Sequence, residues 1–357
     1  MKNIGRVTGS SLRGGMTLVE LLVSGGIIAV MLAILLPSIQ YARESAREMN
    51  CRNNLKQLML AFHGFESAHQ RFPPGTLGFE KAFDYEEHWD DSSSIFFWKR
   101  TQHTSSLGLM LPFFEFENAR QMADQSLFTR DRFLDEFPDR KGRIVDWYGK
   151  AKGFLDIATL DVPLFRCPSD LRDAPPRILA GSQPCIEEDG KVDGFGAIYL
   201  STRLPADYGL TNYLGCAGAY SGGQQMEPIK GPYTGVMSSR ERVTFRNVVD
   251  GSSNTIVYGE TIGYVVDGER IIASPWFIGG LARGRGGIDW MQGQNQASPT
   301  LSHLGNWNNS HGFGFGSRHA GTVNITLLDG SVKPLFRALD WRVLYQYCGR
   351  ADSSASE

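Results

Sequence analysis

The pattern of hydrophobic and polar positions changes sharply within the first seventy residues. Residues 21–42 are mostly apolar and carry no charge. A helix of that length would rise about 33 Å, which is enough to cross the hydrocarbon core of a bilayer. No comparable apolar run occurs later in the chain. The pattern therefore predicts at most one membrane-spanning helix, close to the N-terminus.

The charges that flank this run suggest an orientation. Lys2, Arg6 and Arg13 precede it, and the first charged residue after it is Arg43. The positive-inside rule then favours a cytoplasmic N-terminus and export of the C-terminal bulk. A cleaved secretory signal peptide and a plain signal anchor are the alternatives. A secretory signal peptide would have a shorter apolar core, of about 7–15 residues.

Beyond Pro37 the helical pattern continues but becomes amphipathic. Apolar residues recur at steps of mostly three and four, and arginine, lysine and glutamate fill the other face. Pro37 should kink the helix or loosen one of its turns, and residues 72–75 should end it. We expect one helix from Met16 to about His69, whose second half packs against a globular domain.

The remaining pattern is less regular and mainly β-like. Residues 117–137 are compatible with helix, and residues 162–170 predict a short strand that runs into a turn. Val323–Leu328 and Ser331–Phe336 predict a hairpin, because the Asp-Gly pair between them tolerates the positive φ of a tight turn. The expected fold class is α+β, with a long N-terminal helix packed on an antiparallel sheet and an enlarged β-rich C-terminal head.

Composition and charge exclude several function classes. The 357 residues are 41% hydrophobic and 21% charged, which is ordinary globular usage. A formal net charge of −2 argues against a nucleic-acid partner. The sequence contains no P-loop, GxSxG elbow or HExxH motif. We therefore expect no enzyme activity and no cofactor.

Histidines are the remaining candidates for metal ligands. His303, His311 and His319 recur at spacings of eight in a glycine- and asparagine-rich stretch. Without carboxylates at fixed positions, this pattern does not predict a metal site.

A specific motif stands at the start of the apolar run. The segment 13–20 reads RGGMTLVE, so that Glu20 lies five positions after Gly15. This segment resembles the type IV prepilin signal, in which a peptidase cuts before the membrane segment. The resemblance implies cleavage between Gly15 and Met16, N-methylation of the new Met16 amine, and prepilin peptidase as a partner. The family more often has phenylalanine where Met16 stands.

Glu20 has a physical interpretation within this resemblance. A carboxylate near the bilayer interior is costly unless it is paired. In pilin-like filaments such a glutamate is thought to pair with the N-terminal ammonium of a neighbouring subunit, so the resemblance implies an assembly role for Glu20. The alternative is a side chain that reaches the cytoplasmic headgroups and needs no assembly.

A second resemblance covers nearly the whole chain after Gly15. The segments that carry it are, in order, CRNNLKQLMLAFHGFESAHQRFPPG, LMLPFFEFEN, PLFRCPSD, TNYLGCAGAY, FRNVVDGSSNTIVYGE and FGSRHAGTVNITLLDGSVKPL. This order is similar to the DUF1559 family of prepilin-like proteins. Its closing motif, H-X9-DG, is matched by His319, Asp329 and Gly330. The family's biochemical role is not established, so the resemblance implies little about activity.

The two ends of that motif are not expected to meet. Ten extended residue steps would separate His319 from Asp329 by roughly 33 Å. Asp329 and Gly330 are interpreted as the hairpin turn. For His319 a structural hydrogen bond, metal ligation or partner contact, and catalysis stay open.

The five cysteines are Cys51, Cys167, Cys185, Cys216 and Cys348. An exported head permits disulfides. Cys51 and Cys167 both lie in family-like motifs, and a bridge between them would fasten the helix to the head. A Cys185–Cys216 bridge is a second hypothesis, and burial as free thiols is the alternative to both.

These inferences give a domain plan. Residues 1–15 are the leader, 16–36 the transmembrane part of the helix, 37–72 its amphipathic continuation, 73–350 the exported head and 351–357 a disordered tail.

The expected function is that of a pilin-like or pseudopilin-like structural protein in a secretion or surface apparatus. It would cross the inner membrane once, with a cytoplasmic N-terminus and a periplasmic or cell-surface head, and would assemble with other pilin-like subunits or with itself. The alternative is a tethered surface module that forms no filaments and binds glycans through Trp276, Trp290 or Trp307. An exported enzyme is a third hypothesis.

Overall fold

The computed structural model places most of the chain. The described residues are 17–77, 104–128, 153–170, 177–186, 192–201, 208–221, 234–237, 242–266, 269–277, 282–286, 304–305, 314–336, 339 and 341–351. The chain divides into two compact units, Met1–Ala46 and Arg47–Glu357. The predicted cleavage site at Gly15 and Met16 lies outside the described residues.

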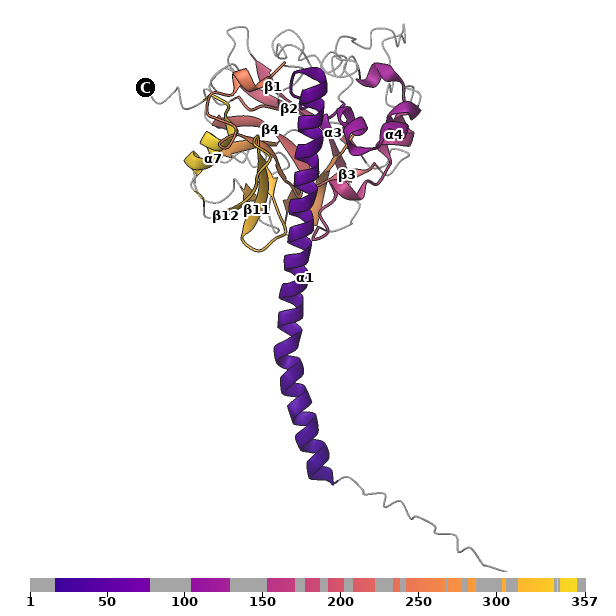
Figure 1. Ribbon diagram of the computed structural model, residues 1–357, viewed down its shortest axis with the longest axis vertical. Coiled ribbons are helices and arrows are strands. Elements are labelled where there is room, and N and C mark those ends of the chain that lie inside the picture. The colour runs from indigo at the N-terminus through magenta and orange to yellow at the C-terminus, as the bar shows by residue number, and fades with distance from the viewer. Residues whose placement is uncertain are drawn as a thin grey trace, which may run out of the picture. The chain divides into compact units, whose positions relative to one another are not determined.

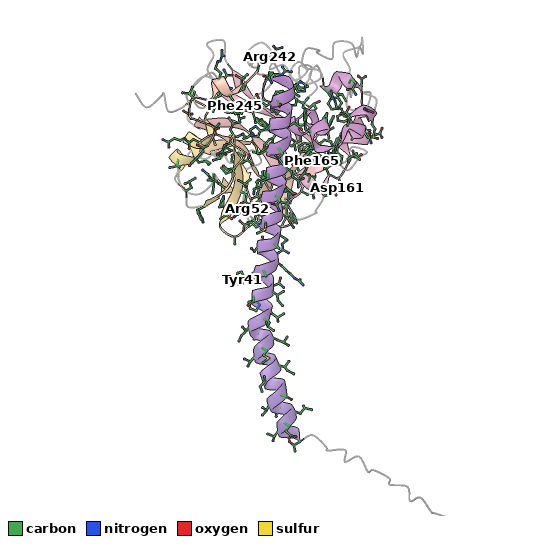
Figure 2. All side chains as sticks on the ribbon, in the orientation of Figure 1. Tyr41, Arg52, Asp161, Phe165, Arg242 and Phe245 are labelled. Carbon is green, nitrogen blue, oxygen red and sulfur yellow. A yellow bond between two sulfur atoms is a disulfide. The ribbon has the colours of Figure 1, made fainter. Side chains whose placement is uncertain are left out.

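The first element is the long helix α1, Leu18–His69, which contains 52 residues (Figure 1). By length and composition its apolar first half could cross a membrane, and none of that apolar window is buried. The helix runs through Pro37 without interruption. Tyr41, at the end of the apolar run, is 78% exposed (Figure 2). The expectation of one long N-terminal helix is confirmed for the described residues.

The second half of α1 belongs to the core of the larger unit. Its buried residues are Cys51, Leu55, Leu58, Met59, Ala61, Phe62 and Phe65. Their spacing of three and four places them on one face, as the amphipathic pattern predicts. Most of them join a hydrophobic cluster with Phe165 (Figure 2), Tyr258 and Trp276. The Phe165 ring lies 5.3 Å from that of Trp276. Burial of these aromatic side chains contributes to the stability of the head.

Short helices and 3-10 turns make up the rest of the helical structure in the described residues, and most of them lie between α1 and the first strand. They are α3 (Ser106–Leu109), η1 (Leu111–Phe114), α4 (Glu117–Met122), η2 (Gln125–Phe128), α6 (Phe154–Ala158), η3 (Pro163–Phe165), η4 (Phe245–Asn247) and, near the C-terminus, α7 (Trp341–Cys348).

The strands of the described part are mostly short. They are β1 (Arg177–Ile186), β2 (Val192–Ser201), β3 (Leu210–Thr211), β4 (Tyr213–Ser221), β5 (Ile256–Glu260), β6 (Tyr264–Val266), β7 (Glu269–Pro275), β8 (Ala282–Gly286), β9 (Leu304–Gly305), β10 (Phe315–Gly316), β11 (Thr322–Leu327) and β12 (Val332–Phe336).

These strands form two five-stranded sheets and one pair. One sheet has the order β2-β1-β7-β3, with β6 on β7, and the other has the order β12-β11-β5-β4-β8; β10 pairs with β9. The β1–β2, β3–β7, β4–β5, β5–β11, β6–β7 and β11–β12 pairs are antiparallel. The β1–β7, β4–β8 and β9–β10 pairs are parallel. The α+β class with mainly antiparallel sheets is confirmed, and the parallel pairs are an addition to it.

The predicted hairpin between β11 and β12 is confirmed. Gly330 has a φ of 83°, which is the left-handed conformation that the tight turn needs. Its N–H donates to the Leu327 carbonyl at 2.9 Å. Partial burial would raise the pKa of Asp329, but hydrogen bonds from Ser331 outweigh that effect, and the pKa is lowered. Asp329 and Gly330 are therefore turn residues.

Two other expectations were wrong. Residues 163–165 form the 3-10 turn η3 instead of a strand, because Pro163 stands at its first position, where a fixed φ and a missing N–H are tolerated. The helix expected over residues 117–137 ends at Met122, because Ala123 is extended. The Gln125 side chain donates to the carbonyls of Arg120 and Ala123 and so stabilises that end.

Candidate functional site around the Cys51–Cys167 disulfide

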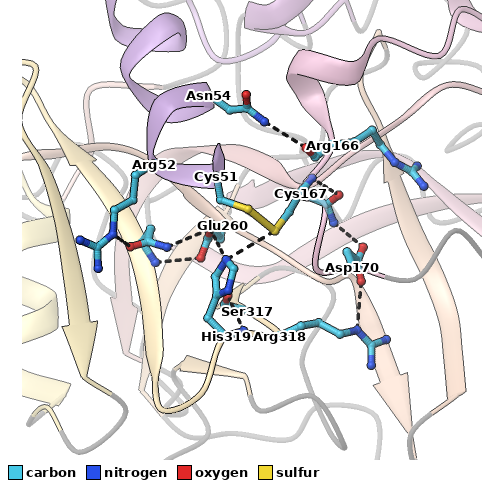
Figure 3. Close-up of a disulfide and its surroundings, with 12 residues drawn as sticks. Cys51, Arg52, Asn54, Arg166, Cys167, Asp170, Glu260, Ser317, Arg318 and His319 are labelled. Atoms are coloured by element: carbon cyan, nitrogen blue, oxygen red, sulfur yellow. Dashed lines mark hydrogen bonds and ion pairs between the residues drawn. A yellow bond between two sulfur atoms is a disulfide. The ribbon is translucent and has the colours of Figure 1, made fainter. Parts of the chain in front are cut away.

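A disulfide joins α1 to the turn that follows η3. Cys51 and Cys167 are 116 residues apart in sequence, and their Cα atoms are 5.3 Å apart (Figure 3). This bridge is the pairing between two motif segments that sequence analysis raised as a hypothesis. Cys216 is a buried free thiol, so the Cys185–Cys216 hypothesis is wrong. The bridge fixes the second half of α1 to the rest of the head.

A buried histidine and a buried glutamate lie against the disulfide. The Nε2 atom of His319 is 3.5 Å from Cys167 Sγ and 3.4 Å from Glu260 Oε1 (Figure 3). The side chains of His319 and Glu260 are 1% and 2% exposed. Glu260 is the last residue of β5, and His319 precedes β11, so the sheet brings both to the sulfurs. His319, the first residue of the H-X9-DG motif, thus contacts the bridge.

Asn324 on β11 orients the glutamate. Its backbone N–H donates to Glu260 Oε2 at 2.9 Å, and its Nδ2 donates to Oε1 at 3.1 Å. The Asn324 Oδ1 atom in turn accepts a hydrogen bond of 3.0 Å from Arg52 Nε on α1. Arg52 also pairs with Glu48, one helical turn earlier, at 2.6 Å. A chain of polar contacts therefore runs from the helix through β11 to the carboxylate.

Asp170 forms a second charged centre close by. It accepts hydrogen bonds from Arg270 NH2 at 2.5 Å, from Arg318 Nε at 3.0 Å and from Asn212 Nδ2 at 2.5 Å. The Asp170 and Arg270 side chains are each 2% exposed, and that of Arg318 is 10% exposed. One carboxylate therefore pairs with two almost fully buried guanidinium groups.

Amides connect the two centres. The Asn212 Oδ1 atom accepts from the Cys167 N–H at 2.9 Å, and its Nδ2 also donates to the Thr261 carbonyl at 3.0 Å. Asn54 on α1 donates to the Arg166 carbonyl at 3.0 Å and to the Tyr213 hydroxyl at 3.2 Å. Because buried polar groups must be paired, these contacts hold the backbone on both sides of the bridge in one arrangement.

Two buried tyrosines give the head a pH dependence. Burial raises the pKa of the Tyr213 hydroxyl, with a further effect of the Glu260 charge, and burial also raises the pKa of Tyr258. In the unfolded chain tyrosine ionises near pH 10. The folded state therefore holds protons that the unfolded state has lost, and its stability falls as the pH rises above about 10.

We expect this effect to be measurable by substitution. Tyr258→Phe removes one such proton and should lessen the fall of the unfolding free energy above pH 10 by about 1.4 kcal/mol per pH unit. Denaturant unfolding at several alkaline pH values measures this slope. An unchanged slope in the variant would show that Tyr258 ionises equally in both states.

The predicted site residues do not all come together. His319 lies in the disulfide cluster, whereas Asp329 and Gly330 lie beyond the other end of β11, in the hairpin turn. The motif therefore has two separate parts, one at each end of a strand. Of the three histidines considered as metal ligands, only His319 is among the described residues. Glu20 lies in the other compact unit.

Glu20 takes part in a local structure that sequence analysis missed. The backbone N–H and the Oγ1 of Thr17 donate to its carboxylate at 2.8 and 3.0 Å, and its own N–H donates to Thr17 Oγ1 at 3.3 Å. This reciprocal pair is a capping box, for which the Thr-x-x-Glu spacing is the sequence signal. The TLVE segment therefore starts the helix.

Sequence analysis also missed most of the cluster. Asp170, Asn212, Glu260 and Asn324 stand in the segments that carry the family resemblance, but as isolated polar residues beside apolar ones. The sequence feature that could have indicated these residues is a polar residue that directly follows or interrupts an apolar strand segment. Arg270 lies outside those segments, and no sequence feature indicated that it belongs to the cluster.

The cluster has the chemistry of a structural centre. Its two sulfurs are bonded to each other, and the Ser317 hydroxyl accepts from the His319 N–H at 3.1 Å. Cys51, Cys167, Glu260 and His319 are all buried, and their four ligand atoms lie within 4.8 Å of one another. These are donor types that bind metal ions, although the sulfurs are not available while they form the bridge.

A separate pocket lies at the end of α1. Its lining includes the rings of Phe65 and Phe113 and the cationic side chains of Arg71 and Arg120, together with His69. Burial and the charges of Arg71 and Arg120 lower the pKa of His69. None of the described lining residues is acidic. The pocket would suit an apolar group that carries a carboxylate.

Of the tryptophans considered for glycan binding, only Trp276 is among the described residues, and it does not line this pocket. Trp276 is buried, and its Nε1 donates to the Leu160 carbonyl at 2.8 Å, so it is a core residue. Trp290 and Trp307 lie outside the described residues.

Comparison with known proteins identifies the family of the chain. The family model described as "Protein of unknown function (DUF1559)" matches residues 40–341. No curated protein and no solved structure matches the chain. The matched range contains the disulfide and every residue of the surrounding cluster, and it begins at the end of the apolar part of α1.

Proposed function

Because the chain belongs to the DUF1559 family and begins its described part with a helix that could span a membrane, we propose that it is a pilin-like structural protein. In this proposal it is a membrane-anchored subunit of a secretion or surface apparatus and acts by assembly instead of catalysis. Its partners are the membrane, prepilin peptidase and other pilin-like subunits or further copies of itself.

One observation carries this proposal. The apolar helix does not end at a linker, because the same α1 supplies the buried face of the head from Cys51 to Phe65. The disulfide and the Arg52–Asn324 contact then fasten that part of the helix to the strands. A subunit that assembles through its helix requires such a connection, because forces on the helix must reach the head without unfolding it.

Location and processing are part of the proposal. We propose cleavage between Gly15 and Met16, a cytoplasmic N-terminus before cleavage, and a periplasmic or cell-surface head. The basic leader residues support this orientation. The Cys51–Cys167 disulfide also supports it, because structural disulfides persist in oxidising compartments outside the cytosol.

Glu20 is proposed to have two successive roles. In the uncleaved chain its carboxylate caps α1 together with Thr17. Cleavage would place a new ammonium group on Met16, beside this cap. In the assembled state Glu20 would pair with the ammonium of a neighbouring subunit, which would neutralise both charges inside the membrane.

Substitutions at the two capping residues test the assembly role. Glu20→Gln keeps a capping side chain but removes the charge, whereas Thr17→Ala removes a cap and keeps the charge. We expect Glu20→Gln to reduce cross-linked assemblies in cells at least about tenfold, because the neighbour's ammonium would lose its counter-charge. Thr17→Ala should retain most of them, since a lost cap costs only about 1 kcal/mol. In vivo cross-linking and blotting measure both.

Equal yields of assemblies from Glu20→Gln and the wild type would contradict the assembly role. They would favour the second candidate, a tethered surface module that does not form filaments. The pocket at the end of α1 is the observation that favours this candidate, with Arg120 positioned to attract a carboxylate. Arg120→Gln should then abolish ligand capture at the surface while leaving assembly unchanged.

A further inference from the structure

We propose that the reduced form of the head holds a zinc ion between the Cys51 and Cys167 thiolates, Glu260 and His319. The disulfide and the zinc site would be alternative states of one centre, because a sulfur bonded to another sulfur does not act as a thiolate ligand. This inference concerns the head alone and does not depend on the assembly role.

The donor set is that of a zinc site, and two of the donor separations already match a tetrahedral geometry. Zinc takes four nitrogen, sulfur or oxygen donors, with bonds of about 2.0–2.3 Å, so neighbouring donors lie about 3.3–3.8 Å apart. His319 Nε2 is already 3.5 Å from Cys167 Sγ and 3.4 Å from Glu260 Oε1. All four donor atoms lie within 4.8 Å of one another. Small side-chain movements after reduction would complete the tetrahedron.

The burial of Glu260 and His319 supports this inference. A disulfide needs no ionisable neighbours, and burying a carboxylate and an imidazole is costly. Both side chains nevertheless lie almost fully buried beside the sulfurs. A metal ion in the reduced state would pair with the carboxylate and would use the imidazole Nε2 atom as a neutral ligand.

Neighbouring residues already orient three of the four donor residues. Asn324 donates two hydrogen bonds to the carboxylate of Glu260, and Asn212 accepts one from the Cys167 N–H. Ser317 accepts from the His319 N–H and so fixes the turn that carries the imidazole. Outer contacts of this kind position metal ligands and usually change metal affinity about 10–100-fold when removed.

Reduction of the disulfide, followed by zinc binding, would convert the first state into the second. A water-soluble phosphine breaks the S–S bond, takes up an oxygen atom from water to form its oxide, and leaves two thiols. Zinc then displaces the two thiol protons. The metal would join α1, β5, the turn after η3 and the segment before β11, so that the reduced head keeps the connection that the disulfide provides.

Metal titration of the full chain in detergent micelles tests this inference. Cobalt(II) serves as a spectroscopic probe, added to protein that has been reduced with phosphine under argon. We expect one equivalent of cobalt with the visible and thiolate charge-transfer bands of tetrahedral sulfur coordination, and its displacement by one equivalent of zinc. The oxidised chain should show no such bands.

Two variants distinguish metal binding at this site from metal binding by other cysteine thiols. His319→Gln should weaken metal binding at least about tenfold, on the scale expected for altered metal-site contacts, whereas Cys216→Ala, which removes a buried cysteine outside the site, should leave it unchanged. The inference is wrong if the reduced wild type binds no stoichiometric metal, or if His319→Gln binds it as tightly as the wild type. It is also wrong if reduction unfolds the head by circular dichroism and added zinc does not refold it.

Discussion

Replacing Cys51 and Cys167 together with alanine should lower the free energy of unfolding of the head by about 4–5 kcal/mol. The bridge closes a loop across a sequence separation of 116 residues. Loss of a loop of that length restores chain entropy worth about 5 kcal/mol to the unfolded state at 25 °C. For a domain of this size the midpoint of thermal unfolding should fall by about 8 °C.

Guanidinium unfolding followed by tryptophan fluorescence measures this change in oxidised, zinc-free protein. The matched control is Cys216→Ala, which removes a buried thiol that forms no bridge. That control should cost no more than about 2 kcal/mol, the usual range for a single buried substitution. A double-variant loss no larger than that of the control would show that the bridge does not stabilise the head.

Asp170→Ala should destabilise the head by about 3–5 kcal/mol. The substitution leaves the guanidinium groups of Arg270 and Arg318 buried without their common counter-charge. Removing one member of a buried ion pair costs this amount because the remaining charge stays desolvated. It also removes the acceptor for Asn212, which orients the Cys167 backbone.

Two further variants identify the cause of that loss. Asp161→Ala changes an exposed aspartate of the head (Figure 2) and should alter the unfolding free energy by no more than about 0.5 kcal/mol. Adding Arg270→Met to Asp170→Ala should restore part of the stability, because a buried apolar side chain replaces a buried charge that has lost the Asp170 carboxylate. If Asp170→Ala is as mild as Asp161→Ala, the buried charges are not energetically coupled.

The parts of the fold that were predictable from sequence are local. The periodicity of α1 depends on neighbours three and four residues apart, and the hairpin at Asp329 and Gly330 depends on two adjacent residues. The error at residues 162–170 was also local, because the position of Pro163 favours a 3-10 turn over a strand. Attention to the Thr17–Glu20 spacing would have identified the capping box.

The buried cluster was predictable only in part, because its contacts are long-range. Asp170 meets Arg270 across 100 residues and Arg318 across 148. Spacing alone cannot choose among the possible cysteine pairs, so the bridge could only be one hypothesis. His319 was singled out by its motif, but nothing local indicated that it would lie against Cys167.

The segments that carry the family resemblance have different structural roles within one head, and none of these roles requires solvent access. The segments around Cys51 and Cys167 supply the bridge, those around Glu260 and His319 surround it, and Asp170 pairs with two nearby arginines. Such a centre fastens the second half of α1 to the rest of the head. That arrangement is consistent with the proposed role as an anchored subunit.

The mature N-terminus is the most direct test of the central claim. Mass spectrometry of the protein isolated from membranes should find a chain that begins at Met16 and carries one methyl group on its amine. The apolar part of α1 would then be retained, with Glu20 near its start. A chain that still begins at Met1, or one cut after the apolar run, would contradict the proposed processing and the pilin-like anchoring that depends on it.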